Sequence, residues 1–215
     1  MTRLYVVAEG LTEVDFVTQI LKPHLEAHTQ HSTTVAAPTI NGYRTYAKLK
    51  KFLKTLLRSQ SRELRVSTMI DLFKLPGDFP GRHKVADLPP LERVQRLEHH
   101  LGEHISDRRF FPYIQLHEFE ALVLVDLPAL AHQHPNRRLA ITELAERLER
   151  DFSTPEQVNG LRPPSYWIKS VVPEYNKRLD GVATVERIGL ARLRARCQHF
   201  GQWLKCLESF HRDPL

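Results

Sequence analysis

Short apolar runs alternate with segments of helical periodicity over the first half of the chain. The runs are rich in β-branched residues and predict four buried strands, at residues 4–8, 33–40, 65–72 and 110–116. Apolar residues recur at helical spacing in the segments between them, at residues 12–25, 43–58 and 89–104. Strands that alternate with helices are typical of a parallel sheet with helices on its faces. We therefore expect an α/β fold with a mostly parallel sheet flanked by helices.

The pattern changes in the last third of the chain. Residues 117–125 return to helical spacing, and no further strand is predicted beyond residue 126. Further helical segments follow at 137–150, 165–179 and 188–210, with several prolines between them. We expect an α/β core over residues 1–125 and a helical C-terminal extension, residues 126–215, that packs on the core.

Composition and charge narrow the class of protein. Hydrophobic residues make up 41% and charged residues 26% of 215 residues, which is typical of a globular protein and excludes disordered and disulfide-rich classes. No apolar run is long enough to span a bilayer. Cys197 and Cys206 lie nine residues apart, unlike the close pairs of zinc sites, so we expect reduced thiols and a cytoplasmic protein. The net charge of +6 permits nucleic acid as a partner.

Four acidic residues follow predicted strands. Glu9 comes after the first strand, Asp71 lies at the end of the third, and Glu118 and Glu120 follow the last. Loops beyond the carboxyl ends of parallel strands converge, so these carboxylates can meet in space. Gathered carboxylates suit Mg²⁺ or Mn²⁺, which prefer oxygen ligands. The alternative is that each acid only interacts favourably with the dipole of a helix N-terminus.

Four blocks of the sequence carry a family resemblance. They are VAEGLTEVDFVTQILKPHL, TMIDLFKLPGDFPG, YIQLHEFEALVLVD and IGLARLRARCQHFGQWLKCLE, and they resemble the successive blocks of the DUF4276 family in order. The first block is also similar to the leading motif of Toprim-like domains, in which a glutamate follows strand one and aspartates follow a later strand. The resemblance implies a Toprim-like fold and metal-dependent phosphodiester chemistry.

The resemblance also implies roles for individual residues. Glu9 takes the place of the Toprim glutamate, a general acid or base and metal ligand, and Asp71 that of the first metal-binding aspartate. The typical Asp-x-Asp is missing because Phe73 stands two residues after Asp71, so Asp78, or else Glu118 or Glu120, would supply the other carboxylate.

A second departure concerns phosphate binding. Members of the family usually carry a segment like APSKR, whereas this chain reads PPSYW at 163–167. Tyr166 and Trp167 replace the two basic residues, and Lys169 is the nearest cation.

Basic residues could bind a phosphate backbone. The helical segment 43–58 carries the first group, which includes Lys48, Lys51, Lys54 and Arg58. A solvated basic helix face is the alternative. Arginines at 187, 192, 194 and 196 form a second group with the same two interpretations.

Other motifs are weak or absent. His100 and His104 have a metal-compatible helical spacing, but no third zinc ligand is evident, so a solvated helix face is favoured. Neither a P-loop nor a GxSxG serine elbow occurs in the sequence.

The leading hypothesis is a divalent-metal-dependent nuclease, or a related phosphodiester-cleaving enzyme, that acts on nucleic acid, DNA in the first place. Toprim-like proteins of this kind resemble the nuclease halves of bacterial defence systems, which implies a partner ATPase and a role in phage defence or DNA repair. The alternative is a catalytically inactive Toprim-like module that binds nucleic acid or a partner protein such as that ATPase. A phosphohydrolase for small molecules is a third hypothesis.

Overall fold

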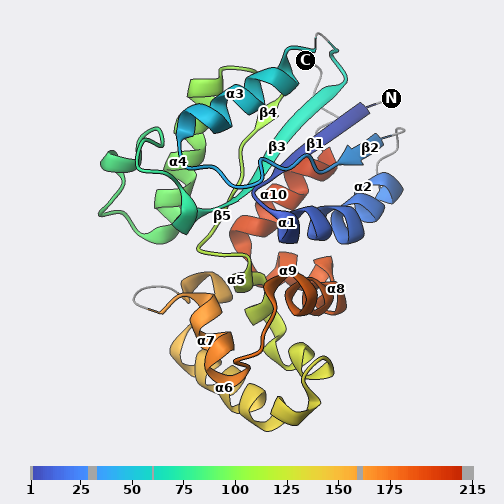
Figure 1. The fold of residues 1–215 in the computed structure, drawn as a ribbon, viewed down its shortest axis with the longest axis vertical. Coiled ribbons are helices and arrows are strands. Elements are labelled where there is room, and N and C mark those ends of the chain that lie inside the picture. The colour runs from blue at the N-terminus through green and yellow to red at the C-terminus, as the bar shows by residue number, and fades with distance from the viewer. Residues whose placement is uncertain (1, 29–32, 60, 159–161, 210–215) are drawn as a thin grey trace. The chain divides into compact units, whose positions relative to one another are not determined.

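A computed structural model of the chain describes residues 2–28, 33–59, 61–158 and 162–209 (Figure 1). The described residues form two compact units. Unit 1 comprises residues 1–115 and 205–215, and unit 2 comprises residues 116–204. The sequence predicts a boundary after residue 125, between an α/β core and a helical extension. That boundary stays a prediction.

Unit 1 contains a parallel sheet. Its strands are β1 (Thr2–Ala8), β2 (Thr33–Ala36), β3 (Leu64–Asp71), β4 (Phe110–Phe111) and β5 (Ile114–Gln115). They lie in the order β2-β1-β3-β4, with β5 also paired to β3, and every pairing is parallel. β1 therefore has β2 on one side and β3 on the other. Because the chain adds β2 on one side of β1 and then β3 on the other, the strand order reverses between β1 and β3.

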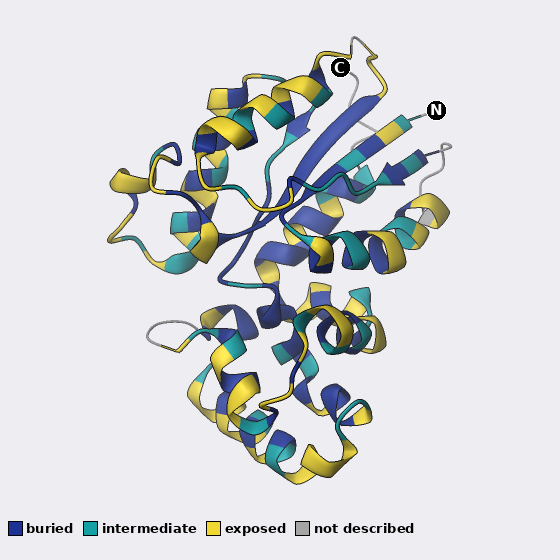
Figure 2. Cartoon of the chain, in the orientation of Figure 1, coloured by how far each residue is buried: buried dark blue, intermediate teal, exposed yellow. Residues whose placement is uncertain are grey.

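Helices flank this sheet (Figure 1). α1 (Leu11–Phe16) continues through a π-helical turn (Val17–Leu21) into α2 (Lys22–His28), whereas α3 (Tyr46–Leu57) and α4 (Pro90–Ile105) cover the other face. β3 is buried at every residue, as Figure 2 shows, because it is central and has helices on both faces. The predicted α/β class, with a mostly parallel sheet flanked by helices and a helical C-terminal part, is confirmed.

Unit 2 contains helices and, among its described residues, no strand. They are α5 (Glu120–Val123), α6 (Arg138–Asp151), α7 (Pro164–Val171), α8 (Val182–Ile188), α9 (Leu190–Arg196) and most of α10 (Gln198–Ser209). Leu130, Ile141, Ile168 and Val185 are fully buried in its core. None of the described helices of the chain combines the length and the apolar character needed to cross a membrane.

Three expected elements are interrupted. The strand predicted at 110–116 is two short pieces, because Pro112 has no N–H and the N–H of Tyr113 donates to Thr68 Oγ1 at 2.9 Å. The helix predicted at 165–179 ends at Val171, before Pro173. The helix predicted at 188–210 is divided between α9 and α10 at Cys197, whose backbone is extended.

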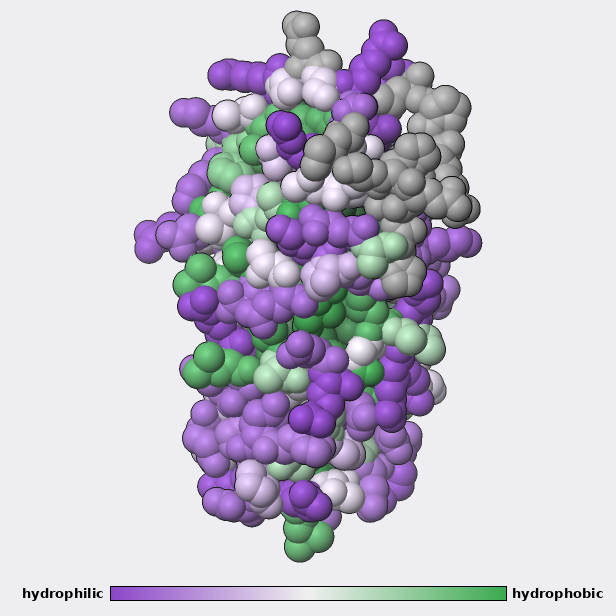
Figure 3. All heavy atoms as spheres, turned by 90° about the vertical axis from the view of Figure 1, so that its right-hand side faces the viewer, coloured by the Kyte–Doolittle hydropathy of each residue, from purple (hydrophilic) through white to green (hydrophobic). Residues whose placement is uncertain are grey.

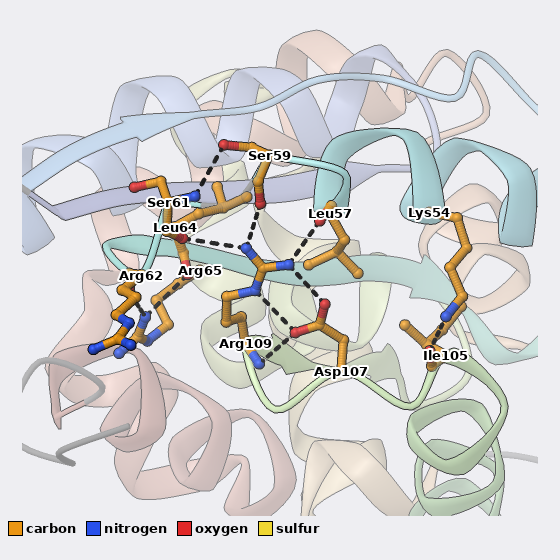
Figure 4. Close-up of polar contacts among 10 residues, drawn as sticks. All are labelled: Lys54, Leu57, Ser59, Ser61, Arg62, Leu64, Arg65, Ile105, Asp107 and Arg109. Carbon is orange, nitrogen blue, oxygen red and sulfur yellow. Dashed lines mark hydrogen bonds and ion pairs between the residues drawn. The ribbon is translucent and has the colours of Figure 1, made fainter.

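A polar network holds the end of α3 against the loop that precedes β4 (Figure 4). The Arg109 guanidinium donates to the backbone carbonyls of Leu57 at 2.6 Å and Ser59 at 2.5 Å. It also binds both carboxylate oxygens of Asp107, at 3.0 and 2.8 Å. Lys54 adds a hydrogen bond to the carbonyl of Ile105. Because the carbonyls at a helix end have no partner within the helix, this network both satisfies them and fixes the position of α3.

The exposed surface is mainly polar. Figure 3 shows one face, on which hydrophilic side chains predominate and hydrophobic ones form smaller areas. Among the described residues, the large hydrophobic side chains that are exposed are Leu11, Phe73, Leu139, Tyr166 and Leu179. Single exposed apolar residues are normal on a globular protein, so only those with a further feature beside them suggest a function.

Candidate active site

Two buried carboxylates meet at the carboxyl edge of the sheet. Glu9 directly follows β1 and Asp71 ends β3, and these two strands are neighbours. Oε2 of Glu9 accepts a hydrogen bond from the backbone N–H of Asp71 at 2.9 Å. Glu9 is 6% exposed and Asp71 is 1% exposed. This acidic pair lies beside the point at which the strand order reverses, where open parallel sheets bind their ligands.

Lys74 bridges the acidic pair. A single turn of 3-10 helix, Leu72–Lys74, follows β3 and returns the lysine toward the strand end. Its Nζ lies 2.9 Å from Glu9 Oε1 and 3.5 Å from Asp71 Oδ2. The Lys74 side chain is 55% exposed, so the ammonium stands between the buried carboxylates and solvent.

Tyr43 has a buried hydroxyl on which the charges of the same carboxylates act. Asn41 and Gly42 have left-handed backbone conformations, with φ of 50° and 69°, and Gly42 N–H donates to the Glu9 carbonyl at 3.0 Å. This turn returns the chain to the sheet edge. Burial, and then the negative charges of Glu9 and Asp71, raise the pKa of Tyr43, so the hydroxyl stays protonated. Its oxygen is buried and has no hydrogen-bond partner in the described part of the chain.

The sequence did not indicate Lys74 or Tyr43 as site residues. Tyr43 lies at the start of the predicted helical segment 43–58, and Lys74 lies two residues after the predicted strand 65–72. The spacing of three residues between Asp71 and Lys74 was the one available signal, because a 3-10 turn brings residues i and i+3 to the same side.

The acidic pair fits a divalent cation in donor chemistry and in charge. Carboxylate oxygens are the ligands that Mg²⁺ and Mn²⁺ prefer, and Mg²⁺ commonly uses one or two carboxylates together with waters and substrate phosphate. When ionised, Glu9 and Asp71 carry two negative charges, and Lys74 is a cation that lies close to both. Buried charges need compensation, and a bound cation is one way to supply it.

Asp78 does not join Glu9 and Asp71. Its carboxylate oxygens accept the backbone N–H of Tyr46 at 2.9 and 3.1 Å, so it satisfies the N-terminus of α3. Within the described residues, no group of three or more His, Cys, Asp or Glu side chains is arranged to hold a metal ion. The structure therefore unites two of the five predicted carboxylates, and the role of Asp78 as a ligand stays a prediction.

Glu118 and Glu120 belong to unit 2 and have partners there. Glu118 Oε2 accepts the backbone N–H of Ser165 at 3.1 Å, at the start of α7, and Glu120 Oε2 lies 3.7 Å from Lys177 Nζ. The first contact satisfies the N-terminus of α7, which is not the helix that follows Glu118 in the sequence. As further metal ligands, both residues stay predictions.

The basic side chains of α3 fall into two groups. Tyr46, Leu49, Leu53 and Leu57 form its buried face, and the predicted phosphate-binding residues are exposed. Lys48 donates to the carbonyl of Gly42 at 2.7 Å, and Lys54 is engaged with Ile105. Lys51 and Arg58 make no ion pair or hydrogen bond with their side chains among the described residues, which leaves their charges free for a ligand.

Lys169 lies exposed on α7 in unit 2. Near it, the Arg162 guanidinium lies 5.3 Å from the ring centre of Tyr166 and 5.6 Å from that of Trp167. An arginine over an aromatic ring is attracted by the ring's quadrupole. Arg162 is therefore a cation beside Tyr166 and Trp167, the two aromatic residues at the positions where members of the family usually have basic residues. The sequence did not indicate Arg162 as a site residue.

Comparison with known proteins identifies the family. The family model described as "Domain of unknown function (DUF4276)" matches residues 8–208, which is most of the chain. The chain belongs to the DUF4276 family. The predicted membership is thus confirmed, and the Toprim-like character of the DUF4276 protein stays a prediction. No curated protein matches it at a significant level.

Two solved structures are similar to this DUF4276 chain. Both are of the C-terminal region of the OLD protein from Xanthomonas campestris pv. campestris. The structure phased with iodine is 12% identical with a TM-score of 0.42, and the match covers 99% of each chain. The structure phased with mercury is 14% identical with a TM-score of 0.43, and the match covers 95% of this chain and 97% of the other.

Proposed function

We propose that this DUF4276 protein is a divalent-metal-dependent nuclease that cleaves phosphodiester bonds at the carboxyl edge of the sheet in unit 1. The observation that carries the proposal is the buried pair of Glu9 and Asp71, bridged by Lys74, where the strand order reverses. Two buried carboxylates close together are costly, and such sites are commonly functional.

Each side chain of the site has a role in this proposal. Glu9 and Asp71 would hold Mg²⁺ or Mn²⁺, which when bound supplies Lewis-acid stabilisation of the phosphate. Glu9 Oε1, on the side of Lys74, takes the proton of the attacking water or returns one to the leaving oxygen. The Lys74 ammonium and the Tyr43 hydroxyl stabilise the negative charge on the non-bridging oxygens. Water adds to phosphorus, one P–O bond breaks, and the proton moves to the leaving oxygen.

The basic residues of α3 supply the nucleic-acid surface in this proposal. Lys51 and Arg58 are exposed cations in the same unit as the acidic pair. Such residues bind phosphates irrespective of base sequence and hold the strand near the site. The partner ATPase and the role in phage defence or DNA repair that the family resemblance implies belong to the same proposal.

The proposal is tested by cleavage of labelled DNA and RNA, single-stranded and duplex, in Mg²⁺, Mn²⁺ or EDTA. We expect metal-dependent cleavage that falls by about 10²–10⁴-fold in Glu9→Gln, the range of one general acid or base. Asp71→Asn should lose activity similarly. The matched control is Asp87→Asn, which removes one exposed carboxylate of the same unit and should leave the rate unchanged. Equal rates in Glu9→Gln and wild type would overturn the proposal.

A second candidate is a nucleic-acid-binding module without catalysis. Two observations favour it: Lys74 already pairs with both carboxylates, and no group of three metal ligands occurs in the described residues. A module of this kind would bind oligonucleotides equally well with Glu9→Gln and would cleave none of them with any metal.

A further inference from the structure

A cavity of about 260 Å³ opens on the segment that follows Asp71 in the chain. Its walls are apolar side chains of the turn after β3 and of α4, together with Arg82 and Arg93. The turn Leu72–Lys74 serves both places, since Lys74 bridges the carboxylates and the preceding Phe73 lines the cavity. Adjacent residues have Cα atoms about 3.8 Å apart, so one short turn joins the cavity wall to the acidic pair.

Phe73 is exposed at the edge of this cavity. It is 42% exposed, although a phenyl ring gains by burial. It also stands where Toprim-like sequences carry a second aspartate, so this chain has an aromatic face in place of a carboxylate. An exposed aromatic ring beside a groove is the feature on which proteins stack the bases of single strands.

Arg93 lines the cavity and carries an unpaired hydrogen-bond donor. One of its terminal nitrogens donates to the carbonyls of Ala86 at 2.5 Å and Leu88 at 3.0 Å, which fixes the guanidinium. Its Nε is buried and has no hydrogen-bond partner in the described part of the chain. A buried donor left unpaired destabilises the protein, and a ligand that accepts this hydrogen bond recovers that loss.

The dimensions agree with one base. A cavity of about 150 Å³ holds a benzene ring, so about 260 Å³ is room for the two fused rings of a purine. The base edges carry oxygen and nitrogen acceptors that match the Arg93 N–H. The apolar side chains of the walls suit the faces of a ring.

We infer that this cavity binds an unstacked nucleobase adjacent to the phosphate at the acidic pair, with Phe73 stacked on its face and Arg93 Nε–H bonded to its edge. The inference rests on the proposed nuclease function and specifies its substrate class. A base inside a duplex cannot enter such a cavity unless it is flipped out. The substrate is therefore single-stranded nucleic acid, or a site at which one base is extruded.

The test measures binding in EDTA, where no cleavage is expected, so its readout is independent of catalysis. Fluorescent single-stranded DNA and RNA oligonucleotides are titrated with the full-length protein and followed by anisotropy. Stacking of one base is worth about 1–3 kcal/mol, so Phe73→Ala should weaken binding by about 5- to 150-fold, whereas Phe73→Tyr should restore it. Leu139→Ala, which truncates a side chain that is 73% exposed in unit 2, is the matched control and should bind as wild type.

Abasic oligonucleotides make the test specific. A set of oligonucleotides carries one abasic position, at a different place in each. At one of these places, the affinity of wild type should fall by about the factor by which Phe73→Ala lowers the affinity for the intact strand. Phe73→Ala should lose nothing further at that position. Unchanged binding by Phe73→Ala, equal losses on single strands and duplex, or no oligonucleotide binding would each overturn the inference. If the abasic position and Phe73→Ala cause the same, non-additive loss of affinity but no metal supports cleavage, the cavity binds a base and the nuclease proposal fails.

Discussion

At the residue scale, the charge balance of the acidic pair depends on Lys74. Glu9 and Asp71 are both nearly inaccessible to solvent, and Lys74 pairs with each of them. In the proposed function, the same ammonium also binds a substrate phosphate. It therefore stabilises the fold without a ligand and would turn to the phosphate when one is bound.

Lys74→Gln should lower the stability of the metal-free protein and make stability depend on metal. The loss of the cation leaves two buried carboxylates close together. We expect a cost of about 1–2 kcal/mol, less than the 3–5 kcal/mol of a fully buried pair, because the lysine side chain is 55% exposed. Addition of Mg²⁺ should raise the melting temperature more in Lys74→Gln than in wild type. Lys74→Arg keeps the charge and serves as the control; equal responses of all three proteins to Mg²⁺ would contradict the metal site.

At the scale of single elements, α3 combines a structural and a binding role. Its buried face packs in unit 1, and its end is fixed by Arg109 and Asp107 (Figure 4). The exposed face carries Lys51 and Arg58, whose charges are free of partners among the described residues. A fixed helix with free cations presents its charges to a phosphate backbone at little entropic cost.

Replacement of both Lys51 and Arg58 by Gln should lower the affinity for oligonucleotides and should also make that affinity less dependent on salt. Each phosphate contact on a single strand contributes about 0.7 to the slope of log K against log salt, so the slope should become shallower by about 1.4. Titrations at several salt concentrations measure it. Lys205→Gln, an exposed lysine of α10, is the matched control. A double variant with the wild-type slope would show that α3 is only a solvated face.

The Asp107–Arg109 contact predicts a pH dependence of stability. The hydrogen bond from Arg109 holds the pKa of Asp107 below its usual value of 3.8. The pKa of Asp107 is thus lower in the folded than in the unfolded protein. The contact therefore contributes fully to the free energy of unfolding at a pH above the unfolded pKa. This contribution is lost as the pH falls through the folded pKa. Asp107→Asn should cost about 1–2 kcal/mol at pH 7, the worth of one charge-assisted hydrogen bond.

Urea denaturation at neutral and strongly acidic pH measures this difference. The cost of Asp107→Asn should shrink in acid, where wild type has also lost the charge. Asp87→Asn, with an exposed side chain, provides the reference. A cost for Asp107→Asn that stays constant with pH would mean that the charge of Asp107 contributes nothing.

At the scale of the whole molecule, the chain forms two units with separate cores. The acidic pair, the adjoining cavity and the basic face of α3 all lie in unit 1. Both tryptophans, Trp167 and Trp203, lie in unit 2. Tryptophan fluorescence therefore reports on unit 2, whereas circular dichroism reports on both.

Leu4→Ala should destabilise unit 1 alone. Leu4 is fully buried in β1, and such a truncation costs about 2–5 kcal/mol. In urea, the circular dichroism transition should then begin earlier while the tryptophan transition stays at its wild-type midpoint. Ile141→Ala, in the core of unit 2, should do the reverse. Identical shifts of both signals in either variant would show that the units unfold together.

The sequence by itself determined the class of fold, the family and the position of Glu9 and Asp71 at strand ends. Apolar runs and helical periodicity are local properties, so they located β1, α3, β3 and α4 to within a few residues. The acidic residues at strand ends followed from the same pattern, because the carboxyl ends of parallel strands meet at one edge. Glu9 and Asp71 are 62 positions apart and still meet.

Only the tertiary structure decided which other groups join that pair. Local periodicity does not encode strand order, so only the tertiary structure shows that β1 and β3 are adjacent strands. The turns that return Lys74 and Tyr43 to the sheet edge depend on backbone conformations with no hydrophobic signature. Asp78 is bound to the N-terminus of α3, since a carboxylate in a loop takes whichever N–H groups the fold places beside it. Contacts between distant residues depend on packing, and packing is a property of the whole chain.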